Sequence, residues 1–140
     1  MYLCIENEFT QFYFMKKYIL DLVVTQNIKL HANYVLIKLT HANPLPEMLP
    51  GQFAEIRIDG SNTTFLRRPI SINYVDKTTN EVWFLVQLVG DGTRKLATVK
   101  QGDIVNVVMP LGNGFTMRWD VTKGKRLRVG GGVGAAPRLM

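Results

Sequence analysis

Short segments in which apolar and polar residues alternate dominate this chain and predict half-buried β-strands. In residues 53–58, Ala54, Ile56 and Ile58 alternate with one aromatic and two charged residues. Alternation with a period of two, enriched in β-branched residues, is typical of strands that bury one face. The expected strands are residues 18–25, 33–40, 53–58, 69–75, 81–89 and 103–109.

Turn-forming residues separate these segments, and one of the intervening stretches has helical character. "NPLPEMLPG" and "DKTTN" consist largely of residues that favour turns. In "GTRKLATVKQG", Thr93 can cap a short helix that places Leu96 and Val99 on one face. Six strands with one short helix predict an all-β fold, a six-stranded antiparallel Greek-key barrel, because closing the sheet removes its exposed edges.

The end of the chain has a different pattern from the barrel. In "KRLRVGGGVG", residues 127–129 predict a strand, and the glycines after it predict a tight turn. This order is typical of the first strand and Gly-rich loop of an α/β nucleotide-binding domain. We therefore expect the barrel at residues 16–122, an incomplete nucleotide-binding domain at residues 123–140, and a chain that is a fragment of a longer protein.

Composition narrows the class of protein further. Of the 140 residues, 46% are hydrophobic and 20% charged, and no apolar run is long enough for a transmembrane helix. Residues 1–14 are expected to be an upstream extension, because Met15-Lys16-Lys17 resembles a natural start. The single cysteine, Cys4, lies in that extension, so an internal disulfide and a cysteine metal cluster are excluded. A cytoplasmic location fits this cysteine usage.

Side chains that could perform catalysis are scarce. His31 and His41 lack neighbours at metal-ligand spacing, no serine lies in a G-x-S-x-G motif, and no carboxylate pair stands out. We therefore predict no catalytic residue and no metal site, and expect any chemistry to come from a bound cofactor. The net charge of +6 suits a phosphate-bearing cofactor, an acidic partner or nucleic acid, or simply a solvated surface.

The segment "LRRPISI" at residues 66–72 is the first candidate for cofactor binding. Pro69 restricts Arg68 to extended geometry, and Ser71 follows around the start of the strand. A guanidinium can donate two parallel hydrogen bonds to phosphate oxygens, and a serine hydroxyl can bond to a heterocycle nitrogen. Arg67 is expected to be a surface residue. The alternative for the whole segment is an edge strand with a surface arginine.

Three further glycine-containing segments could hold a ligand. In "LVGDGT", Gly90 and Gly92 allow close approach of the backbone and Thr93 opens the short helix, although a plain turn with a helix cap explains the same residues. "MPLGNGF" at residues 109–115 is a tight connection with no specific chemistry. "VGGGVGAAP" at residues 129–137 fits a phosphate loop that leads into a helix.

The order and spacing of these segments are more specific than any one of them. R-P-x-S, then G-x-G-T, then P-L-G-N-G-F and finally G-G-G-x-G-x-x-P resemble the ferredoxin–NADP reductase superfamily. "LRRPISI" with "PLGNGF" is most similar to its dihydroorotate dehydrogenase B electron transfer subunits. The resemblance covers residues 16–140 and implies a flavin-binding barrel followed by the first turn of a pyridine-nucleotide domain.

The resemblance implies FAD as the cofactor and assigns its contacts. Arg68 would contact the flavin phosphates, Ser71 would lie near the reactive edge of the isoalloxazine, and Ile70 would replace a stacking tyrosine with an aliphatic contact. The implied FAD-binding positions are Arg68, Pro69, Ile70, Ser71, Leu85, Val86, Gln87, Gly92 and Thr93. The implied start of the NAD site is Gly130, Gly131, Gly132 and Gly134.

The resemblance also implies a function for the full-length subunit. It would accept electrons from a catalytic dihydroorotate dehydrogenase subunit in a heterotetramer and pass them through a [2Fe–2S] cluster and FAD to NAD⁺ in pyrimidine biosynthesis. The fragment alone would bind FAD without efficient NAD turnover. A ferredoxin-type redox partner is one alternative. A basic nucleic-acid-binding barrel is another, disfavoured because Trp83, Phe84 and Trp119 are not interleaved with the late basic residues.

Overall fold

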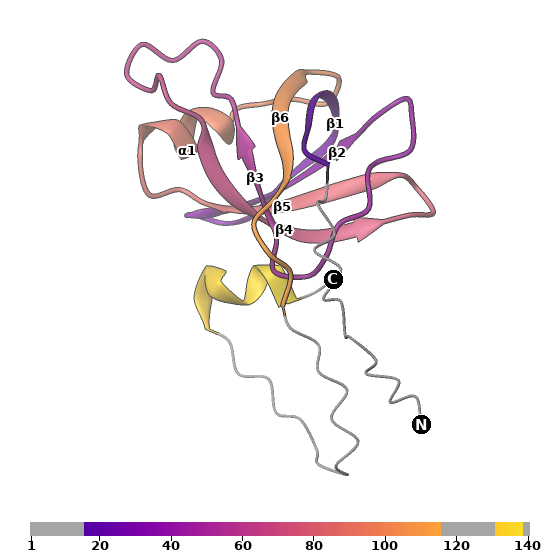
Figure 1. Ribbon diagram of the computed structural model, residues 1–140. Helices are drawn as coiled ribbons and strands as arrows, with labels where there is room; N and C mark the ends of the chain where they lie inside the picture. The colour runs from indigo at the N-terminus through magenta and orange to yellow at the C-terminus, as the bar shows by residue number, and fades with distance from the viewer. Residues whose placement is uncertain (1–15, 116–130, 139–140) are drawn as a thin grey trace, which may run out of the picture.

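A closed antiparallel β-barrel forms the body of the protein, as the alternating pattern predicts (Figure 1). The computed structural model describes residues 16–115 and 131–138. The strands are β1 (Tyr18–His31), β2 (Tyr34–Thr40), β3 (Phe53–Ile56), β4 (Arg68–Asp76), β5 (Glu81–Gln87) and β6 (Ile104–Leu111). Two short helical elements accompany them in the described residues, α1 (Asp91–Leu96) and the 3₁₀ helix η1 (Gly132–Arg138).

The strands follow one another around the barrel in the order β1-β2-β5-β4-β3-β6, and β6 pairs with β1 to close it. β2 and β3 are not neighbours, and neither are β5 and β6, so the chain crosses an end of the barrel twice. Non-sequential antiparallel neighbours of this kind make a Greek-key connection. The second crossover carries α1, which brings the "GDGT" segment back to the barrel.

The core is built from the inward positions of every strand. Val35, Ile37 and Leu39 of β2 are buried, and Ile37 lies directly opposite Phe84 of β5, which is fully buried. β3 ends at Ile56, earlier than predicted, because its pairing with β4 ends where Ile56 meets Arg68. β1 runs further than predicted, since its pairing with β2 continues to His31.

The helix α1 begins earlier than the sequence indicates. Gly90, with extended backbone, is the N-cap, and Thr93 is the third residue of the helix rather than its cap. The Thr93 hydroxyl accepts hydrogen bonds from the backbone N–H groups of Val89 and Gly90, at 3.0 and 3.1 Å. A hydroxyl at this position satisfies N–H groups that the helix itself leaves free. The prediction that Thr93 is the cap residue was therefore wrong, because the cap is Gly90, three positions earlier.

The "MPLGNGF" segment packs against the loop that precedes β3. A Cβ built on Gly114 would lie 2.7 Å from the Cβ of Leu49. The buried Gln52 side chain accepts a hydrogen bond from Leu49 N at 2.7 Å and donates one to Gly112 O at 3.0 Å. These contacts join the two loops, so the described part of this segment has a structural role.

The described part of the glycine-rich tail is helical. Gly132–Arg138 form η1, drawn in yellow below the barrel in Figure 1, and η1 lies beside β4 and β5. Ala136 is only 1% exposed. The predicted strand at residues 127–129 and Gly130 lie outside the described residues. None of the helices that the structure describes has the length and apolar character needed to cross a membrane.

Arg67 links the approach to β4 with β6, which corrects its expected place on the surface. Its guanidinium donates to the backbone oxygen of Asn106 at 3.2 Å and to the side-chain oxygen of Asn106 at 2.5 Å. The Asn106 amide in turn donates to Asp21 of β1 at 2.6 Å. Asn106 is buried, so these bonds hold β1, β6 and the start of β4 in one network.

We expect Arg67→Ala to lower the free energy of unfolding by roughly 1–3 kcal/mol, because the buried Asn106 side chain loses its charged partner. Arg57→Ala is the matched control: Arg57 is exposed and, within the described part of the chain, forms an ion pair only with Asp59, at 2.7 Å, so its loss should leave stability nearly unchanged. Urea denaturation measures both variants. Equal stability of the two would contradict the structural role of Arg67.

Candidate functional site

Arg68 of β4 lies directly against Gly92 of α1, which brings the "RRPIS" and "GDGT" segments together. A Cβ built on Gly92 would lie 2.9 Å from Nε of Arg68 and 3.0 Å from Cγ2 of Thr64. Neither distance leaves room for a side chain, so only glycine fits this position without a shift. The two segments that the sequence proposes for phosphate binding are therefore in contact with each other.

The Arg68 guanidinium is free to bind a ligand. Arg68 is half-buried, and among the described residues its side chain donates no hydrogen bond and forms no ion pair. Arg67, one position earlier, differs in this respect, because its guanidinium donates hydrogen bonds to Asn106. A partly buried cation without a protein partner is a natural counter-ion for phosphate.

The other residues of the turn hold it in shape. The Thr93 hydroxyl also donates to Gly90 O at 3.0 Å, so within the described structure it is bonded to its own turn rather than free for a ligand. Thr64, which the sequence analysis missed, is 5% exposed and packs on Gly92. Its N–H bonds to the Ser61 hydroxyl at 3.0 Å. Nothing in the local sequence marks this threonine, because its burial depends on α1.

A gap in strand pairing lies next to this site. The pairing of β4 with β5 begins at Ile72 opposite Phe84. Among the residues that the structure describes, Pro69–Ser71 therefore pair only with β3, and Leu85–Gln87 only with β2. We call these two stretches, which face each other across the gap, the seam. The seam contains the first and second FAD-contact segments that the resemblance implies.

Backbone groups of the seam are available for ligand contacts. Ile72 N donates to Gln52 O at 3.1 Å on the β3 side. Because alternate residues of a strand direct their N–H and C=O groups to opposite sides, those of Ser71 point away from β3, toward the gap. Pro69 has the same orientation as Ser71. Because proline has no N–H group, it is tolerated at a strand position whose N–H would point away from the neighbouring strand.

Not every predicted residue can offer its side chain. Val86 is fully buried and Ile70 packs on the core, so these two could contribute backbone or partial contacts only. Ser71, Leu85 and Gln87 are half-buried. Gly131, Gly132 and Gly134 are not buried; they belong to the segment around η1, which lies beside the two strands of the seam.

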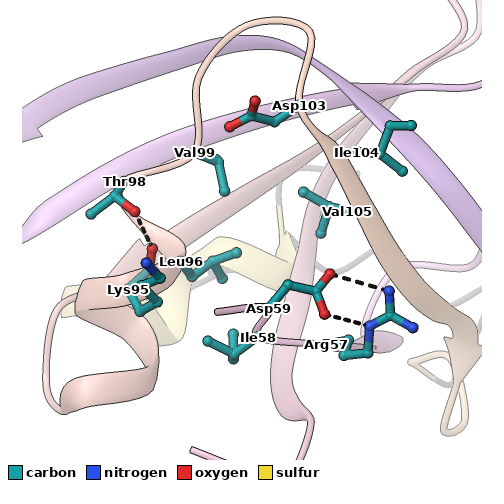
Figure 2. Close-up of a pocket in the computed structure, with 10 residues that line it drawn as sticks. All are labelled: Arg57, Ile58, Asp59, Lys95, Leu96, Thr98, Val99, Asp103, Ile104 and Val105. Atoms are coloured by element: carbon teal, nitrogen blue, oxygen red, sulfur yellow. Dashed lines mark hydrogen bonds and ion pairs between the residues drawn. The ribbon is translucent and has the colours of Figure 1, made fainter. Parts of the chain in front are cut away.

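A separate cavity of about 290 Å³ lies between α1, the end of β3 and the start of β6 (Figure 2). Asp59 accepts two hydrogen bonds from Arg57 there, at 2.7 and 3.2 Å. This hydrogen bonding, together with the negative charge of Asp59, raises the pKa of Arg57. The charge of Arg57 is thus already balanced, and none of the predicted FAD positions lines this cavity. No group of three potential metal ligands occurs among the described residues.

Comparison with known proteins gives consistent results. No family model matches the chain. It is 42% identical over 97 residues to the dihydroorotate dehydrogenase B (NAD(+)) electron transfer subunit of Lysinibacillus sphaericus, which covers 69% of this chain and 38% of that protein. The subunit of the same name from Fusobacterium nucleatum is 34% identical over 117 residues, 84% of this chain and 45% of its own length.

Solved structures show the same barrel. The Amycolatopsis cytochrome P450 reductase GcoB superposes with a TM-score of 0.71 at 22% identity, covering 89% of this chain and 38% of that one. The NADH-dependent reduced ferredoxin-NADP oxidoreductase gives 0.59 at 25% identity, covering 67% and 33%. The chain spans less than half the length of the curated relatives above. It is a homologue of the dihydroorotate dehydrogenase B electron transfer subunits, and its barrel has the ferredoxin reductase-type fold.

Proposed function

We propose that this chain is the FAD-binding barrel of an NAD-linked electron transfer subunit. The observation that carries the proposal is the contact of the unpaired Arg68 guanidinium with the bare backbone of Gly92. It places a free cation beside a turn that has no room for a side chain. The homology to electron transfer subunits supports the same reading.

The residues present fit the diphosphate of FAD. The planar guanidinium of Arg68 can donate two parallel hydrogen bonds to phosphate oxygens. Gly92 keeps the backbone accessible, and Thr64 and Thr93 hold the turn in place. FMN carries a single phosphate, so a clamp of this kind favours FAD.

The seam suits the ring system of the same cofactor. Ser71 directs its backbone N–H and C=O groups toward the gap, and the aliphatic Leu85 borders the gap on β5. Polar groups at one edge and apolar contacts over the face are what an isoalloxazine requires for a fixed orientation. When bound, FAD would supply the redox chemistry; the chain's own residues bind the cofactor and orient it.

In the full-length subunit, we propose a path for electrons from a catalytic dihydroorotate dehydrogenase subunit, within a heterotetramer, through a [2Fe–2S] cluster and FAD to NAD⁺. The names of the curated relatives support the first and last steps. The cluster ligands and most of the NAD site would belong to the remaining length of such a subunit, with Gly130–Gly134 at the start of the NAD site. A cytoplasmic location and a role in pyrimidine biosynthesis follow from this assignment.

The direct test is flavin uptake by the 140-residue chain. We expect the purified protein to bind FAD more tightly than FMN, because only FAD offers a diphosphate to Arg68 and the Gly92 turn. Fluorescence titration with each flavin gives the two dissociation constants, and a visible spectrum shows any flavin that co-purifies. A chain that binds neither flavin would contradict the proposed function, and equal affinities would contradict the diphosphate assignment.

Arg68→Ala should raise the Kd for FAD by about 10- to 150-fold, which corresponds to the loss of roughly 1.5–3 kcal/mol from a charge-assisted pair. Arg57→Ala removes another arginine, already paired with Asp59, and should leave the Kd unchanged. Both variants are titrated at equal salt, since the interaction is electrostatic. If both raise the Kd equally, general charge rather than the Arg68 site binds the flavin.

Gly92→Ala should weaken FAD binding at least tenfold, because the new Cβ would displace Arg68 and Thr64. The matched control is Gly90→Ala in the same turn, where a Cβ meets nothing within 4 Å and the backbone is extended. Far-ultraviolet circular dichroism confirms that both variants fold. Comparable FAD affinity in the two alanine variants would show that the space at Gly92 is not used by the cofactor site.

A further inference from the structure

The dipeptide Asn113-Gly114 lies in the loop that follows β6, with a second glycine just before it. Asn113 is exposed, and among the described residues its side chain forms no hydrogen bond. Gly112 has a φ of +76°, a conformation that glycine adopts without strain. The side-chain amide of Asn113 is therefore held by no protein partner in the described structure, and glycines on both sides leave it uncrowded.

Packing against the neighbouring loop requires glycine at position 114. A Cβ built on Gly114 would lie 2.7 Å from the Cβ of Leu49, closer than real side chains approach. Within residues 16–115 and 131–138, the N–H group of Gly114 donates no hydrogen bond. The fold thus places a backbone nitrogen without a shielding Cβ directly after an exposed asparagine.

This pair of residues can react with itself. The Gly114 nitrogen, once it loses its proton, can attack the side-chain carbonyl carbon of Asn113. A C–N bond forms, the bond to the amide nitrogen breaks, and ammonia leaves with the proton that Gly114 released. Water then opens the resulting five-membered imide at either carbonyl and gives aspartate or isoaspartate. The reaction needs only water, and the close approach of the nitrogen is easiest for a residue without a Cβ.

We propose that Asn113 is a site of spontaneous deamidation, and that its isoaspartate product breaks the junction between this loop and the loop before β3. In isoaspartate the main chain runs through the side-chain carbons, so the loop becomes longer. Two bonds fix the loop on either side of Asn113: Gln52 Nε2 donates to Gly112 O at 3.0 Å, and Phe115 N donates to Pro50 O at 2.7 Å. A longer connection between two fixed points displaces one of them, so one of these bonds is lost.

Asn62 is the matched internal control, because it is also an exposed asparagine in a loop. The residue after it is Thr63, whose branched side chain crowds the backbone nitrogen. The Thr63 N–H is also bonded already, to the Ser61 hydroxyl at 3.3 Å. The two asparagines therefore differ in the nitrogen that would attack them and not in their access to solvent.

The experiment incubates the purified 140-residue chain at mildly alkaline pH and follows both asparagines by peptide mass spectrometry. We expect Asn113 to be converted to the acid at least roughly tenfold faster than Asn62, because Gly114 presents an unshielded nitrogen. The rate should rise with pH, since the attacking group is the deprotonated nitrogen. A protein isoaspartate methyltransferase, which labels isoaspartate and not ordinary aspartate, identifies the product at position 113. Equal conversion of the two asparagines, or no isoaspartate at position 113, would overturn the proposal.

Asn113→Gln tests the effect on the loop, because glutamine would have to form a six-membered imide, which is much slower. We expect incubation to lower the melting temperature of the parent chain by roughly 4–8 °C, the shift that corresponds to losing about one hydrogen bond in a domain of this size. Asn113→Gln incubated in parallel should keep its own melting temperature. An equal fall in both chains, or an isoaspartate-containing parent with an unchanged melting temperature, would overturn the effect on the loop junction. None of these readouts requires a bound flavin.

Discussion

The space at Gly92 is the constraint on which the rest of the site depends. Arg68 begins β4 and Gly92 lies in the crossover from β5 to β6, so the two meet only because the barrel places β4 beside β5. Any side chain at Gly92 would occupy the volume of the Arg68 and Thr64 side chains. The glycine therefore leaves room for the guanidinium at this place, which is where the proposed site would bind a phosphate.

Two adjacent arginines, the last residue before β4 and its first residue, have different surroundings. Arg67 faces Asn106 and connects β6 and β1 to the approach to β4, whereas Arg68 faces Gly92 and has no partner among the described residues. One arginine thus keeps the backbone in place, and the other is left available to a ligand. In the phosphate site proposed above, this support would hold the Arg68 guanidinium in a fixed position.

The sequence predicted the barrel because the period of two is a local property, visible in Ala54, Ile56 and Ile58. It predicted the union of the Arg68 and Gly92 segments only through a family resemblance. It missed what depends on packing: Thr64 is buried by α1, and Arg67 is tied to a strand 39 positions away. The sequence also did not predict the position of Thr93 within α1, because Gly90 can serve as the N-cap of a helix without a side chain.

The seam is an interruption in the pairing of β4 with β5, close to the contact between Arg68 and Gly92. Unpaired strand edges invite association with other chains, and proteins normally close or blunt them. Here Pro69 removes one N–H from the open side of β4, while Ser71 leaves its own directed at the gap. η1 lies beside both strands that border it. An edge that is blunted at one residue and left open at another, next to a guanidinium without a partner among the described residues, supports the proposal that the seam binds the ring of a cofactor whose phosphates Arg68 contacts.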